Sequence, residues 1–175
     1  IQCITRDLLM NQIDLNNKEY DVIIVGAGFS GLYQLICLRD QLGMNCLVVE
    51  TGDDVGGTWY WNRYPGARCD TESHAYSYYF SDELLKEWTW SERYPGHAEI
   101  RRYMNFVADK FDLKKDILFN NKVTSAQYNE DKICWEITTN NKINFRSKFL
   151  ITAVGCLSNA NIPKIKGLEN FKGCL

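Results

Sequence analysis

The chain has 175 residues, of which 45% are hydrophobic and 24% are charged, and its formal net charge is −2. This length and apolar content predict one domain with its own core. The near-neutral charge and the lack of a basic run argue against nucleic acid and favour a small molecule as partner. No apolar run approaches the roughly 18 residues that span a bilayer, and the N-terminus lacks a signal-peptide layout.

The cysteines and histidines narrow the chemistry further. Seven cysteines are an odd number with no C-x-x-C pair, and neither His74 nor His97 pairs with a cysteine at metal-ligand spacing. This usage is typical of reduced thiols. We therefore expect a cytoplasmic protein without a metal site and without a transmembrane segment.

Residues 20–50 predict a strand, a glycine turn, a helix and a second strand. A β-branched run precedes the glycine motif GAGFSG at 26–31, and apolar residues at helical spacing follow it. Gly26 lets the strand turn sharply, Gly28 lets the backbone approach a pyrophosphate, and Gly31 lets the helix pack closely on the strand. The start of the helix would offer amide groups and a partial positive charge to phosphates.

Glu50 closes this unit, 19 residues after Gly31. A carboxylate at this distance can accept the two ribose hydroxyls of an adenosine. It would also repel a 2′-phosphate, so the site is expected to take FAD or NAD in preference to NADP. The alternative is an ordinary tight turn in a βαβ unit. In the helix, the residues expected to cover the sheet are Leu32, Leu35, Ile36, Leu38 and Leu42.

Residues 56–70, GGTWYWNRYPGARCD, fit neither the period of a helix nor that of a strand. We interpret them as a loop whose aromatic rings wall a flat ligand. The alternative is that the four aromatic residues only fill the core beneath a long loop. The charged residues interleaved with them, Arg63, Arg68 and Asp70, favour the ligand wall.

The remaining chain predicts two helices and a set of strands. Ser81 is a good N-cap for a short helix, and a helix over 97–111 has Ile100, Tyr103, Met104, Val107 and Phe111 on its core face. A β-meander follows, with strands near 122–128, 133–138 and 143–145, and a buried strand over 149–155 returns to the parallel sheet. The fold class is α/β: a Rossmann-like FAD/NAD(P)-binding domain with crossover helices and a β-meander insertion.

Two motifs give the sequence a family resemblance. The chain resembles the N-terminal FAD-binding part of class B flavoprotein monooxygenases, of the Baeyer–Villiger type that includes cyclohexanone and phenylacetone monooxygenases. The 26–31 motif is shared by many flavoproteins, whereas the 56–70 motif is diagnostic of the subfamily. At the end of the chain, Phe171-Lys-Gly173-Cys-Leu175 matches the start of the family fingerprint F-x-G-x-x-x-H-x-x-x-W. The resemblance covers about residues 18–175.

The resemblance implies FAD as cofactor and NADPH as co-substrate. In this family NADPH reduces the flavin, reduced flavin reacts with O₂, and a C4a-peroxyflavin converts a ketone to an ester or lactone. The implied partners of this chain are therefore O₂ and a small-molecule ketone or other oxidisable substrate.

The same resemblance assigns residues to the cofactor. Gly26, Gly28, Ser30, Gly31 and Glu50 would hold its ADP half, and Gly57 would also contact the cofactor. Thr58, Trp59, Asp70 and Tyr76 would lie near the isoalloxazine. Arg68 with Asp70 would lie where nicotinamide meets flavin, and the backbone near Val123 would bind the adenine. Asp70 is the candidate catalytic residue, as orienter of the hydrogen bonds beside the flavin. The alternative for Asp70 is a loop-capping aspartate.

Three segments are expected: an N-terminal extension over 1–19, an incomplete FAD-binding domain over 20–155, and a linker over 156–175 toward a missing NADP-binding domain. No second G-x-G-x-x-G follows the first, so we expect a fragment that is inactive alone. Two other functions stay open, an N- or S-oxidising flavin monooxygenase and a nonenzymatic dinucleotide-binding module.

Overall fold

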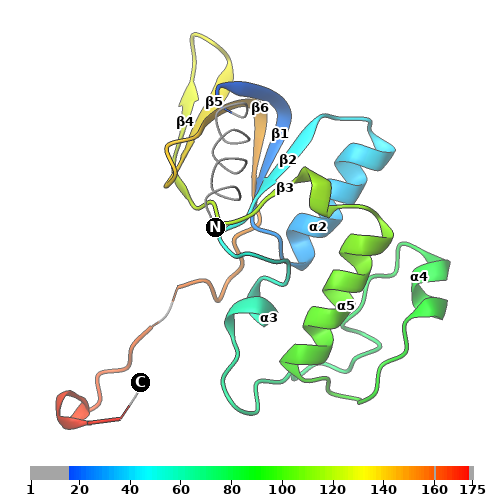
Figure 1. The fold of residues 1–175 in the computed structure, drawn as a ribbon, viewed down its shortest axis with the longest axis vertical. Helices are drawn as coiled ribbons and strands as arrows, with labels where there is room; N and C mark the ends of the chain where they lie inside the picture. The colour runs from blue at the N-terminus through cyan, green and yellow to red at the C-terminus, as the bar shows by residue number, and fades with distance from the viewer. Residues whose placement is uncertain (1–15, 160, 174–175) are drawn as a thin grey trace, which may run out of the picture.

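The computed structural model describes residues 16–159 and 161–173 of the chain. The N-terminal extension expected over 1–19 lies largely outside the described residues. The described part forms one six-stranded sheet in the order β3-β2-β1-β6-β5-β4, with helices packed against it (Figure 1). The predicted α/β class and Rossmann-like sheet are confirmed.

Four strands form the parallel part of the sheet. β1 (Lys18–Val25) pairs with β2 (Cys46–Val49) on one side and with β6 (Asn144–Thr152) on the other, and β2 pairs with the short β3 (Ile117–Leu118). All four residues of β2 are buried. A strand between two parallel neighbours is covered on both faces, which explains its continuous apolar sequence.

The crossover helix α2 (Phe29–Leu35) continues directly into a π-helix, η1 (Ile36–Gln41). Leu32, Leu35 and Ile36 are buried as predicted, but Leu42 is 67% exposed. The N–H of Leu42 donates to the Cys37 carbonyl at 3.2 Å, a bond spanning five residues instead of four. This wider turn displaces Leu42 from the helical stripe, so its predicted place on the sheet is wrong.

The β-meander consists of β4 (Val123–Asn129), β5 (Cys134–Thr139) and β6. The strands predicted at 143–145 and 149–155 are one strand, because the polar residues between them stay extended. Ser147 pairs with Trp135 of β5 on one side and with Tyr20 of β1 on the other. The meander therefore continues the parallel sheet without a break.

The main hydrophobic core lies between the sheet, α2 and α5 (His97–Lys110). Four residues of the predicted stripe, Ile100, Tyr103, Met104 and Val107, are each at most 1% exposed. The fifth, Phe111, is the C-cap of α5 and is only partly buried against the same core. A second cluster contains Ile23, Leu47, Val49, Ile137, Ile143 and Phe145. In the described part of the chain, no helix is both long enough and apolar enough to cross a membrane.

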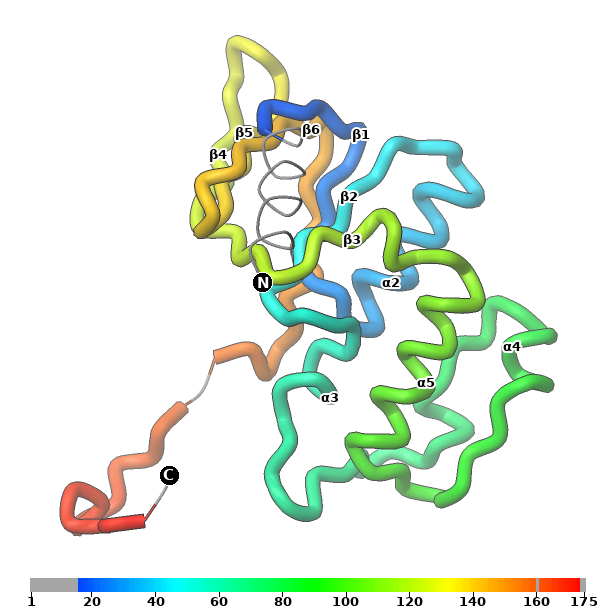
Figure 2. The backbone as a smooth tube through the Cα atoms, viewed as in Figure 1, coloured from blue at the N-terminus to red at the C-terminus, as the bar shows by residue number. Residues whose placement is uncertain are grey.

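Figure 2 shows the path between β2 and β3. The chain passes through the short α3 (Thr58–Trp61) and α4 (Asp82–Glu87) before it enters α5, and η2 (Lys114–Asp116) then leads into β3. At α4 the predicted cap is present, since the Ser81 hydroxyl accepts the N–H of Leu84 at 3.2 Å. After β6, a largely exposed segment containing η3 (Leu168–Asn170) extends away from the sheet.

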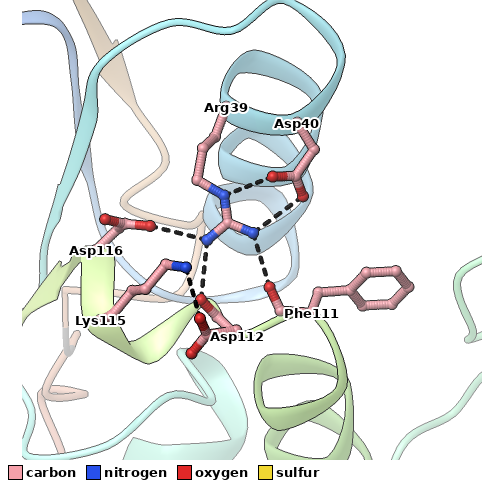
Figure 3. A network of polar contacts seen from close by, with 6 residues as sticks. All are labelled: Arg39, Asp40, Phe111, Asp112, Lys115 and Asp116. Atoms are coloured by element: carbon pink, nitrogen blue, oxygen red, sulfur yellow. Dashed lines mark hydrogen bonds and ion pairs between the residues drawn. The ribbon is translucent and has the colours of Figure 1, made fainter.

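Arg39 of η1 joins the crossover helix to the end of α5 (Figure 3). Its Nη2 donates to the Phe111 carbonyl at 2.7 Å, and its Nη1 donates to the Asp112 carbonyl at 2.9 Å and to Asp116 at 2.8 Å. The hydrogen bonds of Arg39 to Asp40 and Asp116 raise the pKa of its guanidinium, although partial burial opposes this shift. The last carbonyls of a helix have no intrahelical donor, so Arg39 caps α5.

Candidate functional site

A cleft of about 710 Å³ opens at the carboxyl ends of β1, β2 and β6, whose last residues Val25, Val49 and Thr152 line it. In the sheet order, β1 has β2 on one side and β6 on the other, so the connections diverge at this point. Ligands of open α/β sheets bind at such a switch point, outside the carboxyl ends of the strands. The fold therefore places the candidate site here.

The glycine turn forms the first wall of this cleft. Gly26 has a φ of +105°, and a Cβ there would lie 2.7 Å from the Ala153 carbonyl oxygen. A Cβ on Gly31 would lie 1.9 Å from the Gly26 oxygen, so only glycine lets α2 start this close to the strand. These two roles agree with the sequence prediction. Gly28 and Ser30 line the cleft, where amides of the first helical turn lack intrahelical acceptors.

Glu50 is buried at the base of the cleft, with 5% of its surface exposed. Its Oε2 accepts the N–H of Ala27 at 2.6 Å, and its Oε1 accepts the N–H of Gly52 at 2.7 Å. The carboxylate thus joins the glycine turn to the loop after β2, a role that the sequence did not predict. Each carboxylate oxygen has a second lone pair, so these bonds leave acceptor capacity for a ligand.

The second wall is formed by Gly56, Gly57 and the start of α3. The Gly56 N–H donates to the Ala27 carbonyl at 3.1 Å, which ties this wall to the glycine turn. Gly57 faces Gly28 so closely that a Cβ on Gly57 would lie 2.9 Å from the Gly28 Cα. The two glycine segments therefore pack backbone to backbone, and Gly28 and Gly57 present no side chain to the cleft.

Aromatic side chains line the cleft beyond this point. Trp59 is 8% exposed, and its Nε1 donates to the Tyr76 hydroxyl at 3.0 Å, with the two rings packed edge to face. Burial raises the pKa of the Tyr76 hydroxyl, although the bond from Trp59 opposes this. Tyr76 therefore stays protonated, and its own proton remains available to a ligand. Thr58 also lines this part of the cleft.

Val123, at the start of β4, lines the cleft together with Lys122. The segment that follows β6, residues 153–159, lines it as well. Residues 156–159 were expected to belong to a linker, so their place along the cleft was not predicted. The signal was available, because residues that follow a parallel strand emerge at the same edge as those that follow β1.

Three predicted residues are not among those that line the cleft: Gly31, Arg68 and Asp70. Gly31 lies behind the wall, against Gly26. Arg68 is exposed and donates to the Glu92 carboxylate and the Tyr94 carbonyl. Asp70 is also exposed. The structure therefore brings nine of the predicted residues to one cleft and leaves the predicted catalytic role of Asp70 as a prediction.

A parallel sheet with a glycine turn after β1 and a buried acid after β2 defines a Rossmann-like dinucleotide-binding domain. Residues 24–88 also match the family model described as NAD(P)-binding Rossmann-like domain.

Comparison with known proteins narrows this class. The chain is 46% identical to a Baeyer–Villiger monooxygenase of Pseudooceanicola batsensis, over 89% of this chain and 28% of that protein. It is 41% identical to a phenazine N-monooxygenase of Lysobacter antibioticus, over 92% of this chain and 30% of that protein. The solved structure of cyclohexanone monooxygenase from Rhodococcus sp. Phi1 bound to NADP⁺ superimposes with a TM-score of 0.85 at 42% identity, covering 90% of this chain and 30% of that one.

These similarities identify the chain as a homologue of one region of the Baeyer–Villiger flavoprotein monooxygenases. The chain spans less than a third of the length of the relatives it matches.

Proposed function

We propose that this chain is the FAD-binding region of an NADPH- and O₂-dependent flavin monooxygenase that oxygenates ketones to esters or lactones. The observation that carries the proposal is a cleft lined by two glycine segments that pack against each other, and also by a tryptophan and a tyrosine. It occurs in a chain that is 46% identical to part of a Baeyer–Villiger monooxygenase.

The residues of the cleft fit FAD. Gly28 and Gly57 pack backbone to backbone and both line the cleft, so we propose that the diphosphate lies across these two glycines. Gly26 and Ser30 complete this cradle, and Glu50 has acceptor capacity for ribose hydroxyls. The backbone at Val123 would contact the adenine, as the family resemblance implies.

The flavin end of the site has a different composition. Thr58, Trp59 and Tyr76 would border the tricyclic ring, with Tyr76 held in place by the bond from the Trp59 indole. When bound, the flavin supplies the redox and oxygen chemistry, and the chain orients it and keeps water away. Arg68 and Asp70 are exposed, so their proposed place beside the nicotinamide requires a further domain to cover them.

One observation supports a second candidate function. The phenazine N-monooxygenase is 41% identical over 92% of this chain, so the FAD-binding region is similar in relatives named for different oxygenations. N-oxidation of a heteroaromatic compound is therefore the alternative. A nonenzymatic dinucleotide-binding module is the third possibility.

The test uses purified protein that contains this chain. We expect the protein to contain bound FAD, detected by its visible absorption. With cyclohexanone or acetone as substrate, we expect NADPH oxidation and O₂ uptake, together with formation of the corresponding lactone or ester. Oxygenation of phenazine but of no ketone would replace the first proposal by the second. Bound FAD without any NADPH oxidation would favour the nonenzymatic module, and a protein that binds no FAD would refute all three in their flavin form.

We also propose a cytoplasmic location, and O₂ and a small ketone as the reaction partners. The location is supported by the five described cysteines, Cys37, Cys46, Cys69, Cys134 and Cys156, which are free thiols. The proposed organisation remains 1–19 as an extension, 20–155 as the FAD-binding domain and 156–175 as a linker toward an NADP-binding domain.

A further inference from the structure

Tyr60 of α3 lies beside the cleft and is not one of the residues that line it. Its side chain is almost fully buried between two arginines. The guanidinium carbon of Arg63 lies 4.4 Å from the centre of the ring, and that of Arg101, from α5, lies 5.0 Å from it. The Tyr60 hydroxyl donates to Asp53 Oδ1 at 2.8 Å. The ring is therefore fixed by cation–π contacts and by a hydrogen bond.

The loop that carries the second wall packs directly on this ring. A Cβ added to Gly52 would lie 2.8 Å from Tyr60 Cε1, and one added to Gly56 would lie 2.9 Å from Tyr60 Cβ. Gly52 does not have a positive φ, so alanine there would be excluded by the ring alone. Because the arginines hold the ring, it cannot move aside at low cost.

The same loop is anchored to α5 through Asp54. Asp54 Oδ2 accepts from Arg101 at 2.8 Å and from Asn105 at 3.0 Å. Arg101 thus contacts both the Tyr60 ring and the loop residue Asp54. Tyr60 and Arg101 together fix residues 52–57 on the core helix.

Residues 52–57 pack against the glycine turn where both segments line the cleft. Gly56 bonds to the Ala27 carbonyl of the glycine turn, and Gly57 faces Gly28. A displacement of the loop from Tyr60 would therefore move one glycine wall relative to the other. No atom of a ligand needs to touch Tyr60 for this effect.

We propose that Tyr60 is a positioning residue for the cofactor: in contact with Arg63 and Arg101, it keeps the Gly57 backbone packed against Gly28 and thereby sets how tightly the chain binds a diphosphate-containing dinucleotide. The inference rests on the proposed function, since it assumes that the cleft binds such a molecule. It assigns to the aromatic loop a role other than walling the flat ligand.

The test measures FAD affinity in purified protein that contains this chain, for Tyr60→Leu, Gly52→Ala and the double variant. Each single change should weaken FAD binding by about tenfold, because misfit of this size costs on that order. The double variant should bind FAD no more weakly than Tyr60→Leu, because the smaller side chain leaves room for the methyl group. Tyr60→Phe keeps the ring and loses only the two hydrogen bonds that the hydroxyl makes with Asp53, so it should retain most of the affinity.

Phe145→Leu is the control for a general loss of stability. Phe145 belongs to the second hydrophobic cluster and does not line the cleft. The Phe145→Leu variant should have a lower unfolding midpoint, and its FAD affinity should be unchanged at temperatures where the protein is folded. Three outcomes would each overturn the inference. The single variants could bind FAD as well as the unmodified protein does, the losses of FAD affinity could multiply in the double variant, or Phe145→Leu could lose as much FAD affinity as the Tyr60 and Gly52 variants. Unmodified protein that binds no FAD would refute the proposed function itself.

Discussion

A methyl group added at Gly28 would meet little else in the protein, since its nearest neighbour, the Gly57 Cα, would be 3.5 Å away. The φ of Gly28 is −84°, which any residue can adopt. Gly28 lines the cleft, however, so we expect the methyl group to occupy space that a bound diphosphate needs. Folding and ligand binding can therefore be separated at this residue.

We predict that Gly28→Ala changes the free energy of unfolding by less than about 1 kcal/mol and weakens FAD binding strongly. Urea unfolding and FAD titration would measure the two effects. Gly31→Ala is the matched control, because its Cβ would lie 1.9 Å from the Gly26 oxygen and should prevent correct folding. Unchanged FAD affinity in Gly28→Ala would show that the diphosphate does not lie against Gly28.

Glu50→Gln tests the structural role of Glu50, which accepts the backbone N–H groups of Ala27 and Gly52. A glutamine has one acceptor oxygen, so its amide NH₂ would face the N–H of either Ala27 or Gly52. Leaving a buried donor unpaired costs about 1–3 kcal/mol, and we expect this loss in the absence of any nucleotide. Urea unfolding of cofactor-free protein measures it. If Glu50 served only to bind a ribose, the unfolding curve without cofactor would not change.

At the scale of elements, Arg39 shows how η1, α5 and η2 are joined. We predict that Arg39→Met lowers the free energy of unfolding by about 1–3 kcal/mol, the range for hydrogen bonds to a charged group. Arg39→Lys should recover only part of this loss, because an ammonium cannot form the same forked contacts.

Lys115 provides the control for Arg39 in the same region (Figure 3). Lys115 forms an ion pair with Asp112 at 2.5 Å, and both side chains are exposed to solvent. Exposed ion pairs contribute little to the free energy of unfolding. Chemical denaturation of Lys115→Met should therefore be indistinguishable from that of the unmodified protein. Equal losses in the Arg39 and Lys115 variants would contradict the capping role.

The link between the loop and α5 should depend on pH. Burial raises the pKa of Asp54, but the bonds from Arg101, Asn105 and the Val55 N–H outweigh it and lower the pKa below its ordinary 3.8. A carboxyl group whose pKa is lowered by folding stabilises the fold above pH 3.8, and that contribution is lost as the pH falls through the lowered pKa. Acid unfolding of Asp54→Asn should therefore lack the stability loss that protonation of Asp54 causes in the unmodified protein. If the two proteins lost stability identically as the pH falls, Asp54 would not be the group responsible.

For the molecule as a whole, β6 joins the meander to the parallel sheet in one continuous strand. We predict that β5 and β1 unfold together, so that hydrogen exchange gives similar opening free energies for their central amides. Phe145, 1% exposed on β6, should be essential to this unit, and Phe145→Ala should lower both values by about 3–5 kcal/mol. Separate opening of the meander would show that it is an independent insertion.

The sequence alone determined much of this protein, because its strongest signals are local. The glycine turn, the two flanking strands, the Ser81 cap and the stripe of α5 each depend on residues close together in the chain, where sterics and periodicity dominate. The π-helix that exposes Leu42, and the single strand β6, could not be predicted this way. Each depends on hydrogen bonds or strand pairs whose choice local preference does not fix.

Only the tertiary structure decided which residues meet at the site. It brought Val123 and the segment after β6 to the edge where the glycine turn lies, and it left Asp70 exposed. It also gave Glu50 its two backbone donors and placed Tyr60 beneath the loop glycines. These contacts join segments distant in sequence, so their geometry follows from strand order and packing, which motif spacing does not encode.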